Sequence, residues 1–376
     1  MLEDFERNRI ASYFARVVDQ TAPETRLSTV AITHMLTGRP VFLRAIAAMS
    51  HLRAVLPKPK SIDPDALTEA CSLWQVDKLD RRTLATPDEA LAYLESRAAG
   101  ERLVLLDVGG YFAPALPEVC DRFSGEIVGV VEDTENGHRR YLDYDKPPCP
   151  VYSVARSPLK DPEDYLVGQS VVFSTEALIR ARGDILYGRV AAVLGFGKLG
   201  SSVARMLHAR GVQVTVYDID PVKRAQALAQ GFATSATLGQ ALAGSGIVVC
   251  ATGNLALRAD DFARVANGAY IASVTSSDDE LELDALDPLY GRESVGQAIT
   301  RYAHTGHFFY VLNDGNAVNF LHGASVGAFI FLVQAEIIAA AAQLMSEPHE
   351  SAHYELPTEV REQVAATWLD YFNGAA

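Results

Sequence analysis

The 376-residue sequence has few of the features that mark metal-binding, disulfide-rich or nucleic-acid-binding chains. Its four cysteines are far apart and none forms a CxxC pair, which disfavours both a structural zinc site and a disulfide framework. Basic residues number 33 against 47 acidic residues, and the resulting net charge of −14 would repel a nucleic acid. We therefore expect no metal and no nucleic-acid partner.

Signals for secretion and membrane insertion are also lacking. The N-terminal segment is charged from its third residue and has no apolar signal core, so secretion is disfavoured. The longest apolar run, residues 326–344, is interrupted by Gln334, Glu336 and Gln343, and it predicts a buried helix rather than a membrane span. These absences favour a cytoplasmic protein without a membrane partner.

The composition favours an ordered globular protein. Apolar residues make up 49% of the chain and charged residues 21%, and the length suggests two domains at roughly 100–200 residues each. Helical spacing over residues 5–18 and 41–50 alternates with strand-like runs such as 103–106 and 127–131. This alternation predicts an α/β fold with a parallel sheet covered by helices on both faces.

A glycine-rich turn in the second half of the chain carries the clearest functional signal. The segment begins with a β-branched strand, which is followed by Gly195, Gly197 and Gly200. A helix, a second strand and Asp218 come next, in this order. The order is typical of a dinucleotide-binding fold, in which phosphate lies at the N-terminus of the helix. Asp218 follows Gly195 by 23 residues, where a carboxylate accepts hydrogen bonds from ribose and would repel a 2′-phosphate. The motif favours NAD over NADP.

The strand pattern continues beyond this motif. Residues 247–250 form another predicted strand, followed closely by Thr252, which should lie on the nicotinamide side because ligands bind at the carboxyl ends of parallel strands. We expect a Rossmann-type, doubly wound parallel sheet in one domain and a second α/β domain for the substrate. We predict a substrate-binding domain over residues 1–170 and an NAD-binding domain over residues 171–320. Residues 321–376 should form C-terminal helices that return to the first domain.

Six further segments occur in the order found in one enzyme family. They are THM (33–35), DVGG (107–110), VEDTENG (131–137), Lys160 with Asp164, NDGNAVN (313–319) and YELP (354–357). With the glycine turn, they make most of the chain resemble adenosylhomocysteinase, the NAD-containing S-adenosylhomocysteine hydrolase. The resemblance implies NAD as cofactor and a nucleoside-like small molecule as substrate.

The resemblance also implies a reaction and residue roles. In this family NAD oxidises the 3′-hydroxyl of a nucleoside, a 5′ substituent is eliminated, water adds and the ketone is reduced again. Lys160 beside Asp164 would be the base for the hydroxyl, and His34 would handle a proton on the 5′ side or at water. Asp133 lies where a family glutamate binds the ribose. Two alternatives are a solvated salt bridge among Lys160 and its acidic neighbours and a purely structural His34.

Three other residues match cofactor contacts of the family. Thr134 and Asn136 lie where threonines contact the nicotinamide ribose, and the charged Glu135 between them departs from the family pattern. Asn319 matches an asparagine that holds the nicotinamide amide.

Several departures fall on residues that act in the family's chemistry. Val108 replaces an aspartate that takes part in acid–base work, and Ser276 replaces a ribose-binding histidine. His322 follows the nicotinamide asparagine at a different position from the family histidine. Lys58 and Lys60 stand where the family has a polar strand end, and they either meet a carboxylate or phosphate of the substrate or form an exposed turn. We expect altered substrate recognition.

The chain also ends without the Lys- and Tyr-bearing arm that closes over a neighbour's NAD in the family. We therefore expect NAD to exchange with solvent. We still expect a homo-oligomer, a dimer or a tetramer, without the arm around which the family tetramer is built.

Three functions follow from these observations. The favoured one is an NAD-dependent oxidoreductase that oxidises a 3′-type sugar hydroxyl, with the elimination or hydrolysis step lost or altered. The alternatives are a genuine S-adenosylhomocysteine hydrolase and a catalytically silent NAD-binding regulatory relative. The D-2-hydroxyacid dehydrogenases share a similar two-domain plan, but only Arg258 could stand for one of their catalytic residues, and residues 313–322 offer no matching Glu/His pair.

Overall fold

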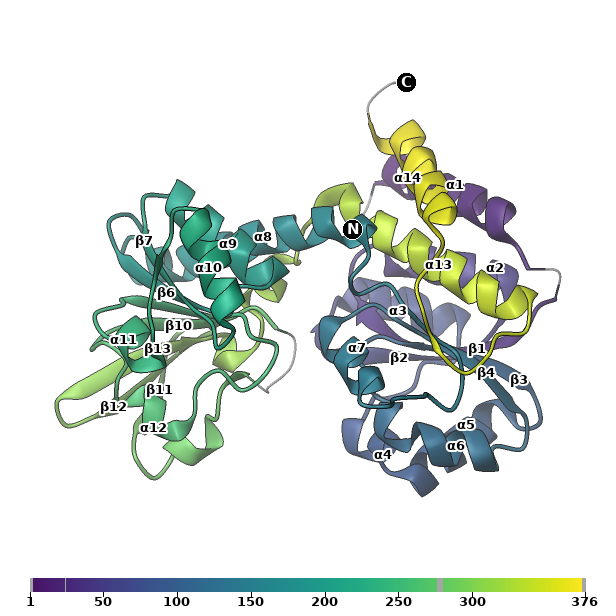
Figure 1. Cartoon of the computed structure of the whole chain (residues 1–376), viewed down its shortest axis with the longest axis horizontal. Coiled ribbons are helices and arrows are strands. Elements are labelled where there is room, and N and C mark those ends of the chain that lie inside the picture. Colours follow the sequence, from purple (N-terminus) through teal and green to yellow (C-terminus); the bar gives the residue numbers. More distant parts are fainter. Residues whose placement is uncertain (1–2, 24, 276–279, 374–376) are drawn as a thin grey trace. The chain divides into compact units, whose positions relative to one another are not determined.

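The computed structural model describes residues 3–23, 25–275 and 280–373. The chain forms two units, which we call unit 1 (residues 1–160 and 327–376) and unit 2 (residues 161–326) (Figure 1). The predicted boundary at residue 170 falls inside helix α8 (Asp161–Ala181), which lies wholly in unit 2. The reason is close packing of α8 on α9 (Lys198–Ala209), where a Cβ atom at Gly168 would lie 2.2 Å from the hydroxyl of Ser202.

Unit 1 is built on a six-stranded sheet whose neighbouring strands are all parallel. Its spatial order is β14 (His353–Tyr354), β5 (Val151–Ser153), β4 (Glu126–Glu132), β3 (Arg102–Asp107), β1 (Ser28–Met35) and β2 (His51–Ile62). The short strand β14 comes from the end of the chain, so the C-terminal segment rejoins the first domain.

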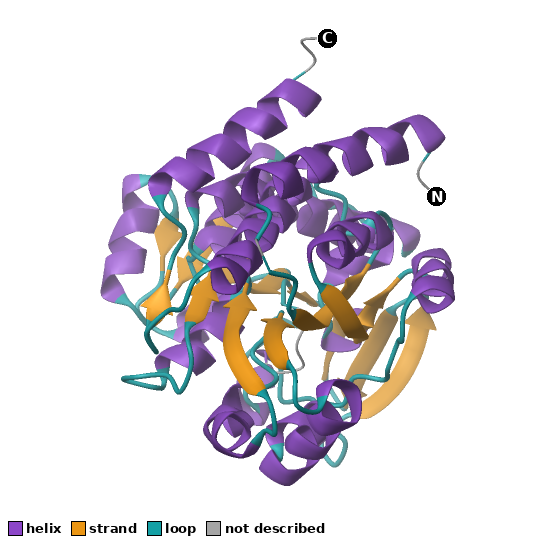
Figure 2. Ribbon diagram, turned by 90° about the vertical axis from the view of Figure 1, so that its right-hand side faces the viewer, coloured by secondary structure: helices purple, strands orange, loops and turns teal. Residues whose placement is uncertain are grey.

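Helices cover both faces of this sheet, and strands lie between helical layers in Figure 2. The core on one face includes side chains of α2 (Arg39–Met49), α3 (Pro64–Leu73) and α13 (Ile330–Ser346), and α1 (Asp4–Thr21) and α14 (Thr358–Phe372) pack on α13. The other face packs on α4 (Arg81–Ala85), α5 (Pro87–Ala98) and α6 (Leu116–Arg122). Burial on both faces explains the nearly continuous apolar strands.

Helix α13 contains most of the long apolar run. Within the described ranges, residues 327–346 are long and apolar enough to cross a bilayer, but 78% of the most apolar stretch is buried inside the protein. The helix packs against β3 and β4 and is flanked by α1, α2 and α14. This is the environment of a core helix, as the interrupting polar residues predict.

Unit 2 contains an eight-stranded sheet. Its order is β11 (Gly291–Gly296), β12 (Ile299–His304), β13 (His307–Leu312), β10 (Tyr270–Ser273), β9 (Ile247–Cys250), β6 (Val190–Leu194), β7 (Gln213–Tyr217) and β8 (Ala233–Thr234). The pairs from β13 to β8 are parallel, whereas β11 and β12 extend the sheet as antiparallel strands. Buried side chains form a core on each face of the sheet. The predicted two-domain α/β class with a Rossmann-type sheet is confirmed.

The cysteines are all free thiols. The neighbouring Cys120 thiol and burial together raise the pKa of the Cys149 thiol. No group of three or more metal-ligating side chains is found over residues 3–23, 25–275 and 280–373.

Candidate cofactor and substrate sites

The glycine turn of unit 2 follows β6 and leads into α9. Gly195 has a φ of +90°, and a Cβ atom there would lie 2.5 Å from the carbonyl oxygen of Ala251. Gly200 approaches the backbone equally closely, since its Cβ would lie 2.0 Å from the carbonyl oxygen of Gly195. A Cβ at Gly197 would meet nothing within 4 Å. The backbone is therefore open at the N-terminus of a 12-residue helix, where a pyrophosphate binds in Rossmann domains.

Asp218 lies immediately after β7 and holds the glycine turn from the side. Its carboxylate accepts hydrogen bonds from the backbone N–H groups of Phe196 at 2.7 Å and Asp220 at 2.9 Å. The side chain is only partly buried, so a carboxylate oxygen can also accept a hydrogen bond from a ribose hydroxyl. This is the position that the sequence predicts for the ribose-binding acid.

Asn319 and Thr252 are the two predicted nicotinamide contacts in unit 2. Asn319 lies in the 3₁₀ helix η6 (Val318–His322), is 4% exposed, and has an amide oxygen without a hydrogen-bond partner among the described residues. Such a buried orphan oxygen can accept a hydrogen bond from a nicotinamide carboxamide. The Thr252 hydroxyl lies 2.9 Å from the carboxylate of Glu280, which also accepts a hydrogen bond from the Gly253 N–H at 2.7 Å. Sequence reasoning missed Glu280.

The open glycine turn, the carboxylate of Asp218 and the orphan amide oxygen of Asn319 fit NAD. These groups would meet the pyrophosphate, the adenosine ribose and the nicotinamide amide. Ser276, another residue singled out in the sequence, lies outside the described residues.

In unit 1, the end of β4 is tied to the turn after β3 by a buried carboxylate, Glu132. Its oxygens accept hydrogen bonds from the backbone N–H groups of Gly109 at 3.0 Å, Gly110 at 2.7 Å and Thr134 at 2.6 Å. A Cβ atom at Gly137 would lie 1.9 Å from Glu132, which explains the glycine in the VEDTENG segment. Burial, with nearby Asp107 and Asp133, raises the pKa of Glu132 to about 8.

Asp107 has a similar structural role at the end of β3. It accepts hydrogen bonds from the backbone N–H groups of Tyr111 and Phe112, both at 2.9 Å, and from the Tyr141 hydroxyl at 2.5 Å. The next residue, Val108, is 4% exposed, so an apolar side chain is buried where the family has an acid. Asp107 and Glu132 thus shape this edge of the sheet with all their carboxylate oxygens hydrogen-bonded.

The three predicted residues after β4 have different surroundings. Asp133 has a buried carboxylate oxygen without a partner in the described part of the chain, so it can accept a hydrogen bond from a ligand. The Thr134 hydroxyl donates to Glu132 at 2.8 Å and accepts from the Gly137 N–H at 3.0 Å, capping α7 (Glu135–Leu142). Asn136 is partly exposed in the first turn of α7.

Glu135, the charged departure between these residues, forms ion pairs with Arg156 at 2.7 Å and Arg139 at 3.0 Å. The charged side chain of Glu135 therefore has a local structural role in these two salt bridges.

His34 lies near the carboxyl end of β1 and is partly buried. Its Nδ1 atom lies 2.5 Å from the hydroxyl oxygen of Ser61. Burial lowers the pKa of His34 well below its usual value, and the positive charges of Lys58, Arg39 and Lys160 lower it further. A neutral imidazole near pH 7 can accept or donate a proton at a reacting group.

The predicted pair Lys160 and Asp164 spans the boundary between the units. Lys160 ends the 3₁₀ helix η2 (Pro158–Lys160), and Asp164 lies in the first turn of α8, 7% exposed and 3.8 Å from the Lys198 ammonium group. Lys198 also pairs with Asp161 at 2.8 Å, so that acidic neighbour of Lys160 is engaged within unit 2. Joint catalysis by Lys160 and Asp164 stays a prediction.

Two other candidate residues, one histidine and one arginine, contact neighbouring residues in unit 2. His322 Nδ1 lies 2.9 Å from the Ser174 hydroxyl, and its ring contacts Phe173 edge-on. Arg258 forms the N-cap of α12 (Ala259–Phe262), where its backbone N–H donates to the Asp261 carboxylate at 3.1 Å.

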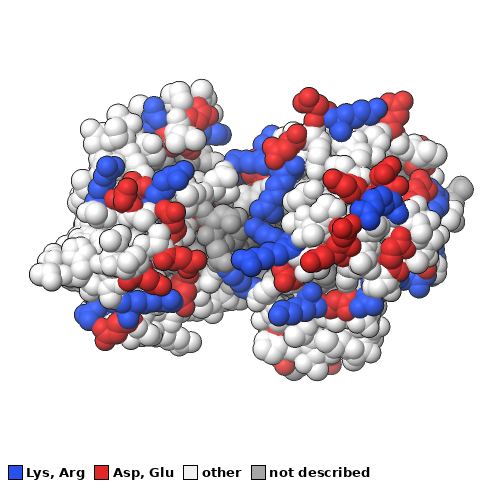
Figure 3. Space-filling view, turned by 90° about the horizontal axis from the view of Figure 1, so that it is seen from below, with Lys and Arg blue, Asp and Glu red and all other residues white. Residues whose placement is uncertain are grey.

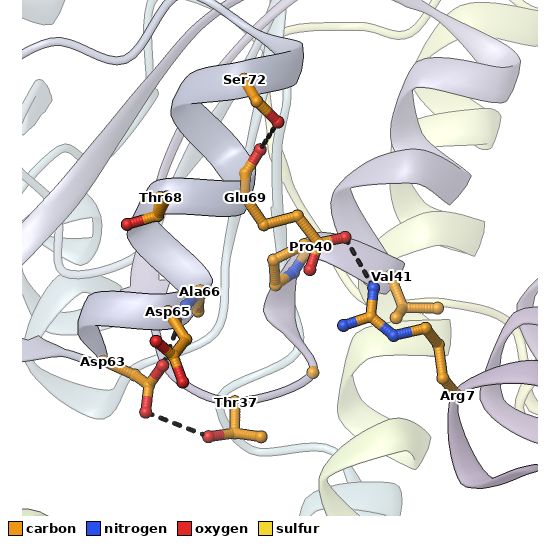
Figure 4. A pocket seen from close by; sticks show the side chains of 11 residues that line it. Arg7, Thr37, Pro40, Val41, Asp63, Asp65, Ala66, Thr68, Glu69 and Ser72 are labelled. Atoms are coloured by element: carbon orange, nitrogen blue, oxygen red, sulfur yellow. Dashed lines mark hydrogen bonds and ion pairs between the residues drawn. The ribbon is translucent and has the colours of Figure 1, made fainter. Parts of the chain in front are cut away.

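A cavity of about 370 Å³ in unit 1 is lined by residues of α1, α2 and α3 and by Thr37 and Asp63, which follow β1 and β2 (Figure 4). Its polar side chains already serve local structure: Arg7 pairs with Glu69 at 2.7 Å, and Asp63 caps α3 by accepting from the Ala66 N–H at 2.9 Å. Thr37 donates a further hydrogen bond to Asp63 at 3.3 Å. These contacts form no pairing of a base with a nucleophile or sugar-binding group.

Comparison with solved structures finds similar two-domain proteins at low sequence identity. A dipicolinate synthase subunit from Bacillus halodurans is 12% identical, with a TM-score of 0.43 over 86% of this chain and 100% of that chain. A putative D-3-phosphoglycerate dehydrogenase from Ralstonia solanacearum is 13% identical, with a TM-score of 0.45 over 86% and 97%. Salmonella D-lactate dehydrogenase is 13% identical, with a TM-score of 0.42 over 85% and 97%.

A comparison with family models gives a more specific result for the cofactor unit. Residues 165–325 match the S-adenosyl-L-homocysteine hydrolase NAD-binding domain. The matched range contains the open glycine turn, Asp218 and Asn319, which confirms NAD as the cofactor. Residues 165–325 are therefore similar to the NAD-binding domain of S-adenosyl-L-homocysteine hydrolase, and this part of the chain is an NAD-binding domain.

Proposed function

We propose that this protein uses NAD to oxidise a 3′-type sugar hydroxyl of a nucleoside or a related small metabolite. The observation that carries the proposal is the buried, unpartnered carboxylate oxygen of Asp133 at the carboxyl end of β4. His34 lies near the carboxyl end of β1 in the same parallel sheet, the edge at which such sheets bind ligands.

Each residue has a distinct role in this reaction. Asp133 accepts a hydrogen bond from a sugar hydroxyl and orients the ring. Lys160 removes the proton of the hydroxyl that is oxidised, and Asp164 orients the sugar hydroxyls. Bound NAD supplies the hydride acceptor. His34 holds or transfers a proton on the 5′ side, which its neutral imidazole allows.

The elimination step of the resembling family lacks one of its acids. Val108 has no group that can transfer a proton, and its side chain is buried. By resemblance, Lys160 and Asp164 match the family's oxidation residues, so we favour an enzyme in which oxidation persists and the elimination or hydrolysis step is lost or carried by His34. A genuine S-adenosylhomocysteine hydrolase and a silent regulatory relative are the competing functions.

The test is reduction of bound NAD, followed by its near-ultraviolet absorbance, with a panel of nucleosides and their 5′-thio, 5′-phospho and deoxy analogues. We expect an absorbance increase with at least one ribonucleoside, no increase with its 3′-deoxy analogue and none in Lys160→Ala. Lys146→Ala is the matched control, because Lys146 is exposed in the loop before β5, at the opposite edge of the sheet.

The competing functions give different results. Release of homocysteine from S-adenosylhomocysteine, measured with a thiol reagent, would establish the hydrolase. Tight NAD binding without reduction by any compound, together with an unchanged cellular phenotype in Lys160→Ala, would favour the regulatory function.

A further inference from the structure

Strand β2 bulges beside His34. Thr33 of β1 is opposite Pro57 of β2, but Met35 is opposite Ile62, so β2 uses several extra residues to pass the single residue His34. Bulges re-aim side chains and are common next to active sites. This one buries Lys58 and Ser61 and leaves residues 59–60 exposed.

Lys58 is an unusual lysine because it is 6% exposed. Its ammonium group lies 5.9 Å from the centre of the Tyr111 ring, and a Cβ atom at Gly109 would lie 3.3 Å from its Nζ atom. Within the described ranges, Lys58 has no ion pair and no side-chain hydrogen bond. A buried ammonium group without a paired anion is costly, so this position calls for a negative charge that the chain does not place in contact with it.

The nearby carboxylates do not fill this need by contact. Asp107 and Glu132 use their oxygens for backbone N–H groups and hydroxyls. Asp133 acts on Lys58 through its charge, without an ion pair, and keeps an unpartnered oxygen of its own. An unpaired cation and an unpaired acceptor thus lie at the same edge of the described sheet.

A second cation lies over the same aromatic ring. The Arg81 guanidinium group is 4.9 Å from the centre of the Tyr111 ring, and its positive charge also acts on Lys58. Figure 3 shows Lys and Arg side chains gathered in a band on one side of unit 1, although the chain as a whole carries a net charge of −14. The two cations at the Tyr111 ring suit this position to an anion.

We propose that Lys58, with Arg81 beside it, binds an anionic group of the substrate, a phosphate or a carboxylate, next to His34. This inference rests on the proposed function, because it treats the carboxyl edge of unit 1 as the substrate site. It deepens that function by assigning the substrate a negatively charged substituent on the 5′ side. Lysine and arginine together form charge-assisted hydrogen bonds with phosphate or carboxylate oxygens.

The test compares ligands that differ in charge at one position. Calorimetry measures binding of adenosine, adenosine 5′-monophosphate, the 5′-carboxylate of adenosine, ribose and ribose 5-phosphate to the full-length protein loaded with NAD. We expect the anionic compounds to bind more tightly than their neutral counterparts. Lys58→Met, which keeps the alkyl chain, should weaken the preferred anion by about tenfold or more and leave adenosine almost unchanged.

Two further variants provide the controls. Lys60→Met removes the exposed lysine of the same bulge and should keep the preference for the anion. Lys58→Arg should retain part of it. Circular dichroism and NAD affinity report whether each variant is folded, independently of the substrate.

The outcomes separate this inference from the proposed function. Equal binding of neutral and anionic ligands, or a preference that survives in Lys58→Met, would overturn the anion site, and NAD reduction by adenosine would then still support the nucleoside oxidoreductase. Lys58-dependent binding of ribose 5-phosphate without binding of any nucleoside would support the anion site and reject the nucleoside. The anion that binds more tightly, phosphate or carboxylate, identifies the group recognised by Lys58. If none of the compounds binds, the inference is overturned.

Discussion

The imidazole Nδ1 atom of His34 lies 2.5 Å from the hydroxyl oxygen of Ser61, across the bulge between β1 and β2. The two residues are far apart in sequence and are brought together because β2 takes extra residues at this point. The contact fixes the orientation of the imidazole through Nδ1.

We expect Ser61→Ala to release the His34 ring. Loss of the hydrogen bond should lower the free energy of unfolding by about 1–2 kcal/mol, because a buried imidazole nitrogen loses its partner. The nitrogen chemical shifts of His34 measured by NMR should change from those of one tautomer to those of a mixture. Ser72→Ala is the control, since Ser72 is exposed on α3. Unchanged His34 shifts in Ser61→Ala would argue against this orienting role.

Alanine substitutions at two glycines of the cofactor turn should affect protein stability and NAD binding differently. Gly197→Ala places a methyl group in open space at a φ of −74°, so we expect an unchanged melting temperature but NAD binding weakened by about tenfold or more, because the methyl group blocks the pyrophosphate. Gly200→Ala would bring a Cβ within 2.0 Å of the Gly195 carbonyl and should cost about 1–3 kcal/mol of stability. Thermal unfolding and calorimetry distinguish the two effects. Full NAD affinity in Gly197→Ala would contradict the assigned position of the pyrophosphate.

Asp218→Ala should weaken NAD binding while the domain stays folded. The variant loses a charged acceptor for the ribose, worth about 1.5–3 kcal/mol, and also the acceptor of the Phe196 and Asp220 N–H groups. NADP should lose less affinity than NAD, because the repulsion of its 2′-phosphate disappears. Asp260→Ala, an exposed change on α12, is the control for loss of an acidic side chain in the same unit. Equal losses for the two cofactors would show that Asp218 does not discriminate between them.

Glu336 should make unit 1 less stable as the pH rises. Glu336 is 1% exposed on α13, and burial raises the pKa of its carboxyl group from 4.5 to about 7. Because the folded-state pKa is the higher one, the contribution of the neutral carboxyl group is fully present below about pH 4.5 and is lost through about pH 7, a total of about 3 kcal/mol.

Urea unfolding between about pH 5 and about pH 8 measures this contribution. Glu336→Gln should flatten the loss of stability over that range, whereas Glu359→Gln, an exposed change on α14, should leave it in place. An equally steep loss in Glu336→Gln would assign the pH dependence to other groups.

Residues close together in the sequence were predicted well. The turn from Gly195 to Gly200 needs particular backbone freedom over six positions, and Asp218 follows one helix and one strand later, so their spacing is a local property. The alternation of helices and strands likewise predicts parallel sheets, because such crossovers require them. The cofactor and the fold class could therefore be inferred before the tertiary structure was known.

Contacts between distant segments could not be inferred in this way. Lys58 and Lys60 have similar neighbours in the sequence, but the bulge in β2 buries only Lys58. Cys120 raises the pKa of Cys149 although nothing in their spacing indicates that the two thiols are neighbours.

The VEDTENG segment illustrates both what the sequence predicts and what only the tertiary structure shows. By resemblance, its sequence directs attention to Asp133 and Thr134, but it does not reveal that Glu132 reaches across to the N–H groups of Gly109 and Gly110. Sequence by itself determined several strands of the parallel sheets and the cofactor turn, because those depend on side-chain periodicity and local backbone freedom, but it did not predict the antiparallel strands β11 and β12. Only the tertiary structure decided which charges are buried, paired or left unpaired at the edge of the described sheet, because burial and pairing depend on neighbours that are distant in the chain.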